Sequence, residues 1–203
     1  MTARASIACI AWGSLVWDPR ELPCVPPWRD DGPLLPVEFA RESADRRITL
    51  VICDGVPTVR CSWSPLTATT LSDARRALGL REFGRPDAPG IDRCIGWWDR
   101  ATDDARGRQA DVIAAWAASH DLSGVVWTDL PPRFGGVEGR VPAVDQVLTH
   151  LRALPADARQ RAETYVRRAP VQTDTLVRRR IAAELGWTPA VVGLPGAAAD
   201  VRR

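Results

Sequence analysis

The sequence contains no lysine, because all 27 basic residues among its 203 are arginine. This absence excludes chemistry that depends on a lysine amine, such as a Schiff base or the lysine of a P-loop. Histidine is also scarce: only His120 and His150 occur, far apart in the chain, whereas a zinc site needs clustered ligands at short spacing. We therefore expect no metal site.

Several signatures of catalysis and nucleotide binding are missing as well. No G-x-S-x-G nucleophile elbow is present, and Ser14 has no obvious histidine base near it in the sequence. The glycines at 135–139 lack the strand-to-helix context of a dinucleotide or phosphate loop. These absences argue against a serine hydrolase and against a nucleotide-binding protein.

The cysteine and charge patterns favour a soluble, reduced, cytoplasmic setting. The five cysteines form no CxxC pair, and no apolar run reaches the roughly 18 residues of a membrane span or has the form of a secretory signal. The net charge of +2 does not suggest a nucleic-acid footprint. The arginine clusters at 167–168 and 178–180 are interpreted as solvated helix faces, with phosphate contact as the alternative.

What the sequence does contain begins with one apolar stretch, residues 7–19, which Gly13 and Ser14 interrupt. Glycine inside a strand pattern marks either a bulge or a close approach of the backbone to another group. Residues 12–15 are therefore interpreted as a ligand-binding loop at the end of a first strand, and a simple bulge or tight turn is the alternative.

The hydrophobic periodicity predicts an α+β protein. A small, mixed, barrel-like β-sheet with flanking helices is expected over residues 1–142, and a helical C-terminal extension packed on this core over 143–203. The pattern predicts an Asp54-Gly55 hairpin turn, with Gly135 and Gly136 in a loop. The expected strands are 7–12, 37–43, 47–53, 56–63, 91–98 and 124–128, and the expected helices are 71–81, 107–119, 143–154, 156–168 and 174–186.

Glu82 is the candidate general acid/base. It follows the predicted 71–81 helix, where the helix dipole is negative and an ionised carboxylate is disfavoured, as a group that exchanges protons near neutral pH requires. The alternative is a solvated glutamate in a frayed last turn. Glu38, Glu42 and Asp129 are weaker candidates of the same kind.

Two segments also occur in a familiar order. Ile10-Ala11-Trp12-Gly13-Ser14-Leu15-Val16-Trp17 is similar to the motif Y-G-S-L-(I/V)-W, and about seventy residues later a helix ends in Ala77-Leu78-Gly79-Leu80-Arg81-Glu82. Between them, residues 39–43 and the strand 48–53 match a second and a third strand. Together, over residues 5–100, they resemble the γ-glutamylcyclotransferase-like superfamily, especially its ChaC-like branch. Trp12 stands where that motif has tyrosine.

The resemblance implies a function and roles for residues. The backbone N–H groups of Gly13, Ser14 and Leu15 would hold the α-carboxylate of a γ-glutamyl substrate, with Trp12 and Arg41 also in the binding site. Glu82 would take a proton from the α-amine, which attacks the γ-carbonyl, closes 5-oxoproline and releases an amine or peptide. The partner is thus a small γ-glutamyl molecule, and no cofactor is implied because the reaction is intramolecular. The alternative is a non-catalytic carboxylate-binding protein on the same fold.

Overall fold

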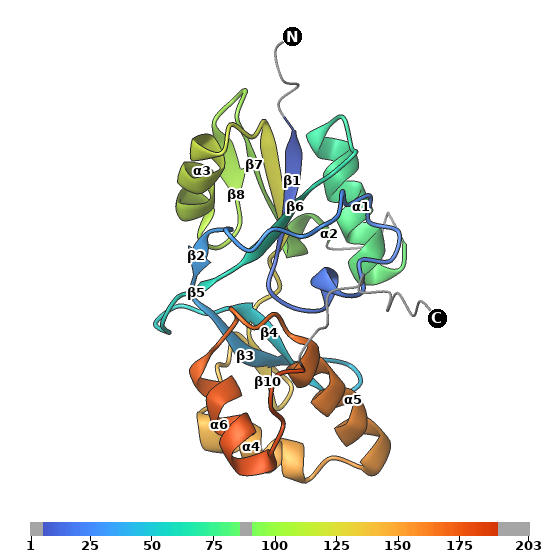
Figure 1. Ribbon diagram of the computed structural model, residues 1–203, viewed down its shortest axis with the longest axis vertical. Helices are drawn as coiled ribbons and strands as arrows, with labels where there is room; N and C mark the ends of the chain where they lie inside the picture. Colours follow the sequence, from blue (N-terminus) through green and yellow to red (C-terminus); the bar gives the residue numbers. More distant parts are fainter. Residues whose placement is uncertain (1–5, 86–90, 191–203) are drawn as a thin grey trace, which may run out of the picture.

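The computed structural model describes residues 6–85 and 91–190, and shows an α+β protein with mixed sheets and C-terminal helices (Figure 1). The upper part of Figure 1 is a five-stranded sheet with strand order β6-β1-β9-β7-β8. Its central pair, β1 and β9, is parallel, and the other neighbours are antiparallel. The strands are β1 (Ile7–Ala11), β6 (Ser62–Pro65), β7 (Ile95–Asp99), β8 (Asp104–Arg106) and β9 (Gly124–Thr128).

Strand β1 is buried on both faces, which explains its continuous apolar sequence. Ala8 and Ile10 point into a core shared with helix α3, and Ile7 and Cys9 point into a second core shared with helix α1. The two helices therefore cover opposite faces of the sheet, and the end of β1 is fixed from both sides. These helices are α1 (Leu71–Phe83) and α3 (Ala110–Ser119).

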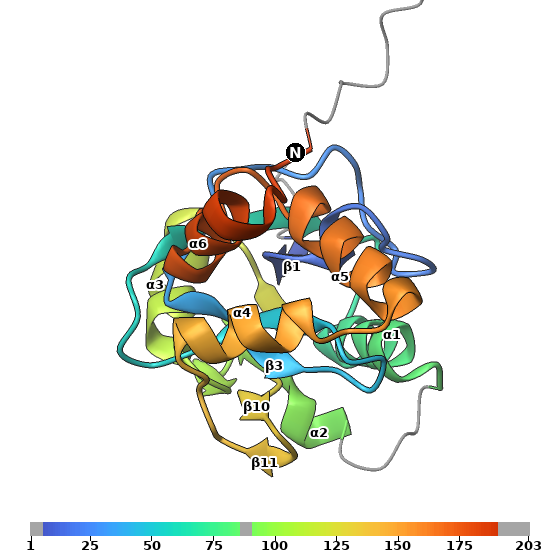
Figure 2. The same cartoon turned by 90° about the horizontal axis from the view of Figure 1, so that it is seen from below.

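A second sheet lies in the lower part of Figure 1 and has the order β11-β10-β3-β4. Its apolar face packs against three C-terminal helices, which lie nearest the viewer when the molecule is seen from below (Figure 2). The strands are β3 (Val37–Glu42), β4 (Ile48–Ile52), β10 (Arg133–Phe134) and β11 (Val137–Glu138). The helices are α4 (Val144–Arg152), α5 (Ala156–Arg168) and α6 (Leu176–Leu185).

The expected barrel is wrong, because no sheet closes on itself within the described residues. Strands β2 (Leu34–Leu35) and β5 (Val59–Arg60) form a separate pair, and the five-stranded sheet ends at β8, whose side chains are exposed. Closure of the five-stranded sheet would need its two edge strands, β6 and β8, to pair with each other. Instead, the two larger sheets each bury a face against helices.

Most predicted elements are confirmed within a few residues, and two local predictions are wrong. The turn at Asp54-Gly55 is not a hairpin, because the strand after it pairs with β2 rather than with β4. Residues 91–94 form the short helix α2 (Ile91–Cys94) ahead of β7. The predicted loop at Gly135 and Gly136 is confirmed, and it connects the two short antiparallel strands β10 and β11.

Arg178 is buried, so the interpretation of residues 178–180 as a solvated helix face is wrong for this residue. Its side chain is 1% exposed, and its guanidinium donates to four carbonyl oxygens, those of Val166, Ala169, Pro170 and Thr173 at 2.6–3.1 Å. These carbonyls belong to the end of α5 and the segment that follows it. Arg178 therefore anchors α5, and its guanidinium is already occupied by these carbonyl groups.

Replacing Arg178 by methionine should lower the free energy of unfolding by about 3 kcal/mol, because buried carbonyls lose their only charged donor. Urea denaturation measures the change. The matched control is Arg179→Met, since Arg179 is exposed and pairs with Asp174 at 3.2 Å at the surface. That control should cost less than about 0.5 kcal/mol, and equal losses in the two variants would contradict the anchoring role.

Candidate functional site

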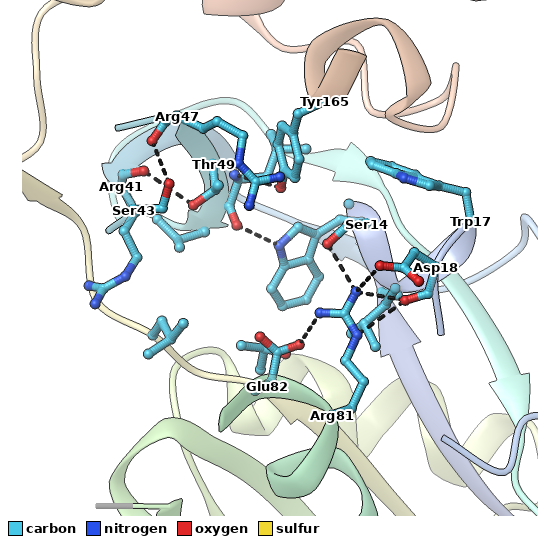
Figure 3. A pocket seen from close by; sticks show the side chains of 18 of the residues that line it. Ser14, Trp17, Asp18, Arg41, Ser43, Arg47, Thr49, Arg81, Glu82 and Tyr165 are labelled. Atoms are coloured by element: carbon cyan, nitrogen blue, oxygen red, sulfur yellow. Dashed lines mark hydrogen bonds and ion pairs between the residues drawn. The ribbon is translucent and has the colours of Figure 1, made fainter. Parts of the chain in front are cut away.

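A cavity of about 710 Å³ lies between the two larger sheets, and Figure 3 shows most of its lining. Side chains reach it from the end of β1, from strands β3 and β4, from the end of α1 and from α5. Thr128 at the end of β9, the parallel neighbour of β1, also contributes. The cavity thus sits beyond the carboxyl ends of two adjacent parallel strands, a common location for ligand sites in open sheets.

The loop after β1 forms one wall of this cavity. Gly13 is followed by a single turn of 3-10 helix, η1 (Ser14–Val16), which closes when Val16 N–H donates to Gly13 O at 3.1 Å. The N–H groups of Gly13, Ser14 and Leu15 find no acceptor within the described part of the chain. Since successive free amides make a concave surface suited to an anion, the predicted ligand-binding loop lines a cavity and has unused donors.

Arg81 ties this loop to the end of α1. Its side chain is 8% exposed, and it donates to the backbone oxygen of Asp18 at 2.7 Å and to Ser14 Oγ at 3.2 Å. Its third contact is an ion pair with Glu82, in which Arg81 Nη1 and Glu82 Oε1 are 2.9 Å apart. One buried guanidinium therefore fixes the position of the loop relative to Glu82 (Figure 3).

Glu82 lies in the last turn of α1 and lines the cavity. Its side chain is 15% exposed, so it is not the solvated glutamate that the alternative interpretation required. Arg81 occupies one carboxylate oxygen, and the other has no hydrogen-bond donor among the described residues. The arrangement leaves one oxygen able to accept a proton from a group bound in the cavity.

Trp12 and Arg41, the other two residues expected to bind substrate, also line the cavity. The indole of Trp12 is buried and donates to Leu50 O at 3.1 Å, so its only polar group is already used. Arg41 donates to Pro131 O at 2.7 Å and has no carboxylate partner among the described residues. The negative charge of Glu138 acts on its guanidinium from beyond ion-pair distance, and the guanidinium lies across the cavity from Trp17 (Figure 3).

The weaker carboxylate candidates are each bound to other groups of the protein, and none of them lines the cavity. Glu38 is buried and accepts the N–H groups of Phe39 at 2.8 Å and Val177 at 3.3 Å, which joins β3 to the start of α6. Glu42 accepts Gly135 N–H at 3.1 Å.

Asp129 is held by Arg108, whose guanidinium lies 3.1 Å from its carboxylate. Since Asp129 does not line the cavity, Glu82 is the candidate of the four whose carboxylate can meet a ligand there.

Sequence reasoning missed the contribution of α5. One face of this helix lines the cavity, and its members recur at the helical spacing i, i+3, i+4, i+7 and i+8: Asp157, Gln160, Arg161, Thr164 and Tyr165. A polar stripe on an amphipathic helix is normally a solvated face, so the local pattern carries no sign of a ligand. The role of the C-terminal helices in the site depends on tertiary packing alone.

Within 6–85 and 91–190, no three Cys, His, Asp or Glu side chains gather in a way that could hold a metal ion. No helix in these ranges is both long and apolar enough to cross a membrane.

Comparisons with protein-family models, with curated proteins and with solved structures found no match.

The buried Glu38 makes stability depend on pH. Burial raises its pKa above the ordinary value of 4.5, against the opposing effect of hydrogen bonds from Thr175, Phe39 and Val177. The folded protein therefore holds a proton that the unfolded chain releases, so this contribution to stability is present below about pH 4.5 and is lost as pH rises through the folded-state pKa.

Glu38→Gln should remove this dependence. The free energy of unfolding of the wild type, taken relative to the variant, should fall between pH 4 and pH 7 when measured by urea denaturation. Glu21→Gln, at an exposed position, serves as the control and should leave the wild-type pH profile unchanged. A difference that rises with pH would contradict the assignment.

Arg81→Met should lower the free energy of unfolding by about 2–4 kcal/mol, because the loop and Glu82 lose their common buried donor. The amide of Asp18, which donates to Ser14 O at 2.8 Å, should also exchange with solvent faster. Arg76→Met, at an exposed position of the same helix, is the matched control. If both variants unfold at the same urea concentration, Arg81 is not the tether.

Proposed function

We propose that this protein is a γ-glutamylcyclotransferase-like enzyme, which cyclises a γ-glutamyl amine or peptide to 5-oxoproline and releases the amine. The observation that carries the proposal is one cavity lined both by residues 13–15, whose amides have no acceptor among the described residues, and by Glu82. The family resemblance implies that this loop and Glu82 act on one substrate, although they are about seventy residues apart in sequence.

The loop would bind the α-carboxylate of the substrate. The N–H groups of Gly13, Ser14 and Leu15 have no acceptor within the described chain, so a carboxylate can accept them without displacing a protein group. Hydrogen bonds from amides to an ionised oxygen are stronger than those between neutral groups. The bound carboxylate places the α-amine and the γ-carbonyl further along the cavity.

Glu82 would move the protons of the reaction. Its free oxygen takes one proton from the α-ammonium, and the resulting amine attacks the γ-carbonyl carbon to form the new C–N bond. The protonated Glu82 then gives that proton to the leaving nitrogen, and the bond to the leaving group breaks. The extra proton left on the ring nitrogen passes to the released amine, which departs as an ammonium ion. The step is intramolecular, so it needs positioning and proton transfer rather than a cofactor.

Arg41 would contact the leaving side of the substrate. Among the described residues its guanidinium has no carboxylate within ion-pair distance, although the charge of Glu138 acts on it from further away, and it lies across the cavity from Trp17 and Asp18 (Figure 3). A polar or anionic group on the leaving amine could accept from it.

Glu82→Gln should reduce 5-oxoproline formation by about 10²–10⁴-fold, the usual contribution of general acid/base catalysis. The assay incubates the purified protein with γ-glutamyl amino acids, γ-glutamyl amines and γ-glutamyl dipeptides and quantifies 5-oxoproline by mass spectrometry. Glu21→Gln, outside the cavity, is the control and should keep the wild-type rate. An unchanged rate in Glu82→Gln would remove Glu82 from its role.

A non-catalytic carboxylate-binding protein is the second candidate. The ion pair between Arg81 and Glu82 favours it, because a structural partner already holds one oxygen of the proposed base. Binding of 5-oxoproline without turnover of any compound in the panel would support this function over the enzyme.

A further inference from the structure

Tyr165, the only tyrosine in the sequence, brings a phenol from the C-terminal helices into the cavity. It lies on α5, and its ring is held edge-on by Trp17 and Phe39 at centroid distances of 5.6 and 6.2 Å. The guanidinium of Arg47 lies 5.4 Å from the ring centre. Since these contacts come from three separate segments of the chain, the ring has a defined position before any ligand enters (Figure 3).

The hydroxyl of Tyr165 has an unused donor. Its oxygen accepts Leu50 N–H at 3.2 Å, and its own proton has no acceptor among the described residues. Burial raises the pKa of Tyr165 to about 12, and the charge of Glu82 acts in the same direction, so the group remains a neutral phenol at physiological pH. A phenol whose oxygen is held in place from one side can donate its proton toward the cavity.

The hydroxyl also lies directly against the anion-binding loop. A Cβ atom added to Gly13 would stand 2.6 Å from the Tyr165 oxygen, closer than such contacts occur. Glycine is therefore needed at this position, because any side chain here would collide with the phenol. The absence of a side chain lets the phenol approach the loop.

We infer that Tyr165 is a substrate-binding residue, which donates its hydroxyl proton to the ligand carboxylate held by residues 13–15. The identity of the carboxylate as that of a γ-glutamyl compound or of 5-oxoproline rests on the proposed function. The loop amides and the phenol then contact the same anion from two elements, so the C-terminal helices form part of the binding site.

Tyr165→Phe tests this role, with 5-oxoproline as the binding probe. The variant keeps the ring and removes only the hydroxyl, so calorimetry should find about tenfold weaker binding of 5-oxoproline, as expected for one lost hydrogen bond to a charged group. In turnover of a γ-glutamyl compound, KM should rise by a similar factor while kcat stays within about twofold.

Ser64→Ala is the matched control. Its hydroxyl is also buried and donates to Val25 O at 3.0 Å, but Ser64 does not line the cavity. Removing it should leave the binding of 5-oxoproline unchanged. If Ser64→Ala weakens binding as much as Tyr165→Phe does, the effect of the phenol is general destabilisation, and the inference is wrong.

The probe 2-pyrrolidinone separates a direct contact from an indirect one, because it has the ring of 5-oxoproline without the carboxylate. Tyr165→Phe should not change the binding of this compound. Equal losses of affinity for both ligands would show that the hydroxyl maintains the structure of the site and does not contact the ligand carboxylate.

A direct readout is also possible because the chain has a single tyrosine. Protein labelled with ¹³C at the phenol carbon should give one tyrosine signal, which 5-oxoproline should shift with the same Kd that calorimetry reports. An unshifted signal at saturation would overturn the inference.

The outcomes distinguish the inference from the proposed function. If the wild type forms 5-oxoproline and Tyr165→Phe matches it in both Kd and KM, only the role of Tyr165 is wrong. If 5-oxoproline binds in a Tyr165-dependent way but no γ-glutamyl compound is cyclised, the carboxylate site stands and the cyclotransferase is wrong. Absence of both binding and turnover overturns both.

Discussion

The buried guanidinium of Arg81 is the interaction on which the candidate site depends. Removing a charge from water is costly unless polar partners surround it, and Arg81 has them in Ser14, Asp18 and Glu82. Each partner is a part of the site or the segment next to it. A change in the loop would therefore remove some of the partners of a buried charge, and this couples the shape of the loop of residues 13–15 to the position of Glu82.

The two sheets supply the rigid frame for this interaction. Strand β1 is buried on both faces, so the loop that follows it starts from a fixed point. The other wall comes from β4 and α5, and Leu50 connects them: Trp12 donates to its carbonyl and its own N–H donates to Tyr165. Arg178 in turn holds the end of α5 through four carbonyl oxygens. The cavity is thus bounded by side chains that are hydrogen-bonded before a ligand arrives.

Local sequence patterns predicted the parts of the fold that local physics decides. The predicted helix 71–81 forms as α1, whose start Thr70 caps by accepting Asp73 N–H, and the apolar run at residues 7–11 forms a buried strand. Strand pairing is not local, which is why the barrel and the hairpin at Asp54-Gly55 were wrong. A turn sequence permits a chain reversal, but β4 pairs with β3 while β5 pairs with β2.

The residues of the candidate site also differ in whether local sequence could predict them. Glu82 and residues 13–15 were predicted because a helix end and an interrupted strand are visible in sequence, and the structure brings them to one cavity. Tyr165 was not, because at its position in an amphipathic helix a buried aromatic residue is an ordinary core residue. Its hydroxyl becomes informative only when its neighbours are known, because those neighbours leave the proton without an acceptor and leave no room for a side chain at Gly13. A donor that is available to a ligand is found by showing that no protein group accepts from it, and this can be shown only in the folded chain.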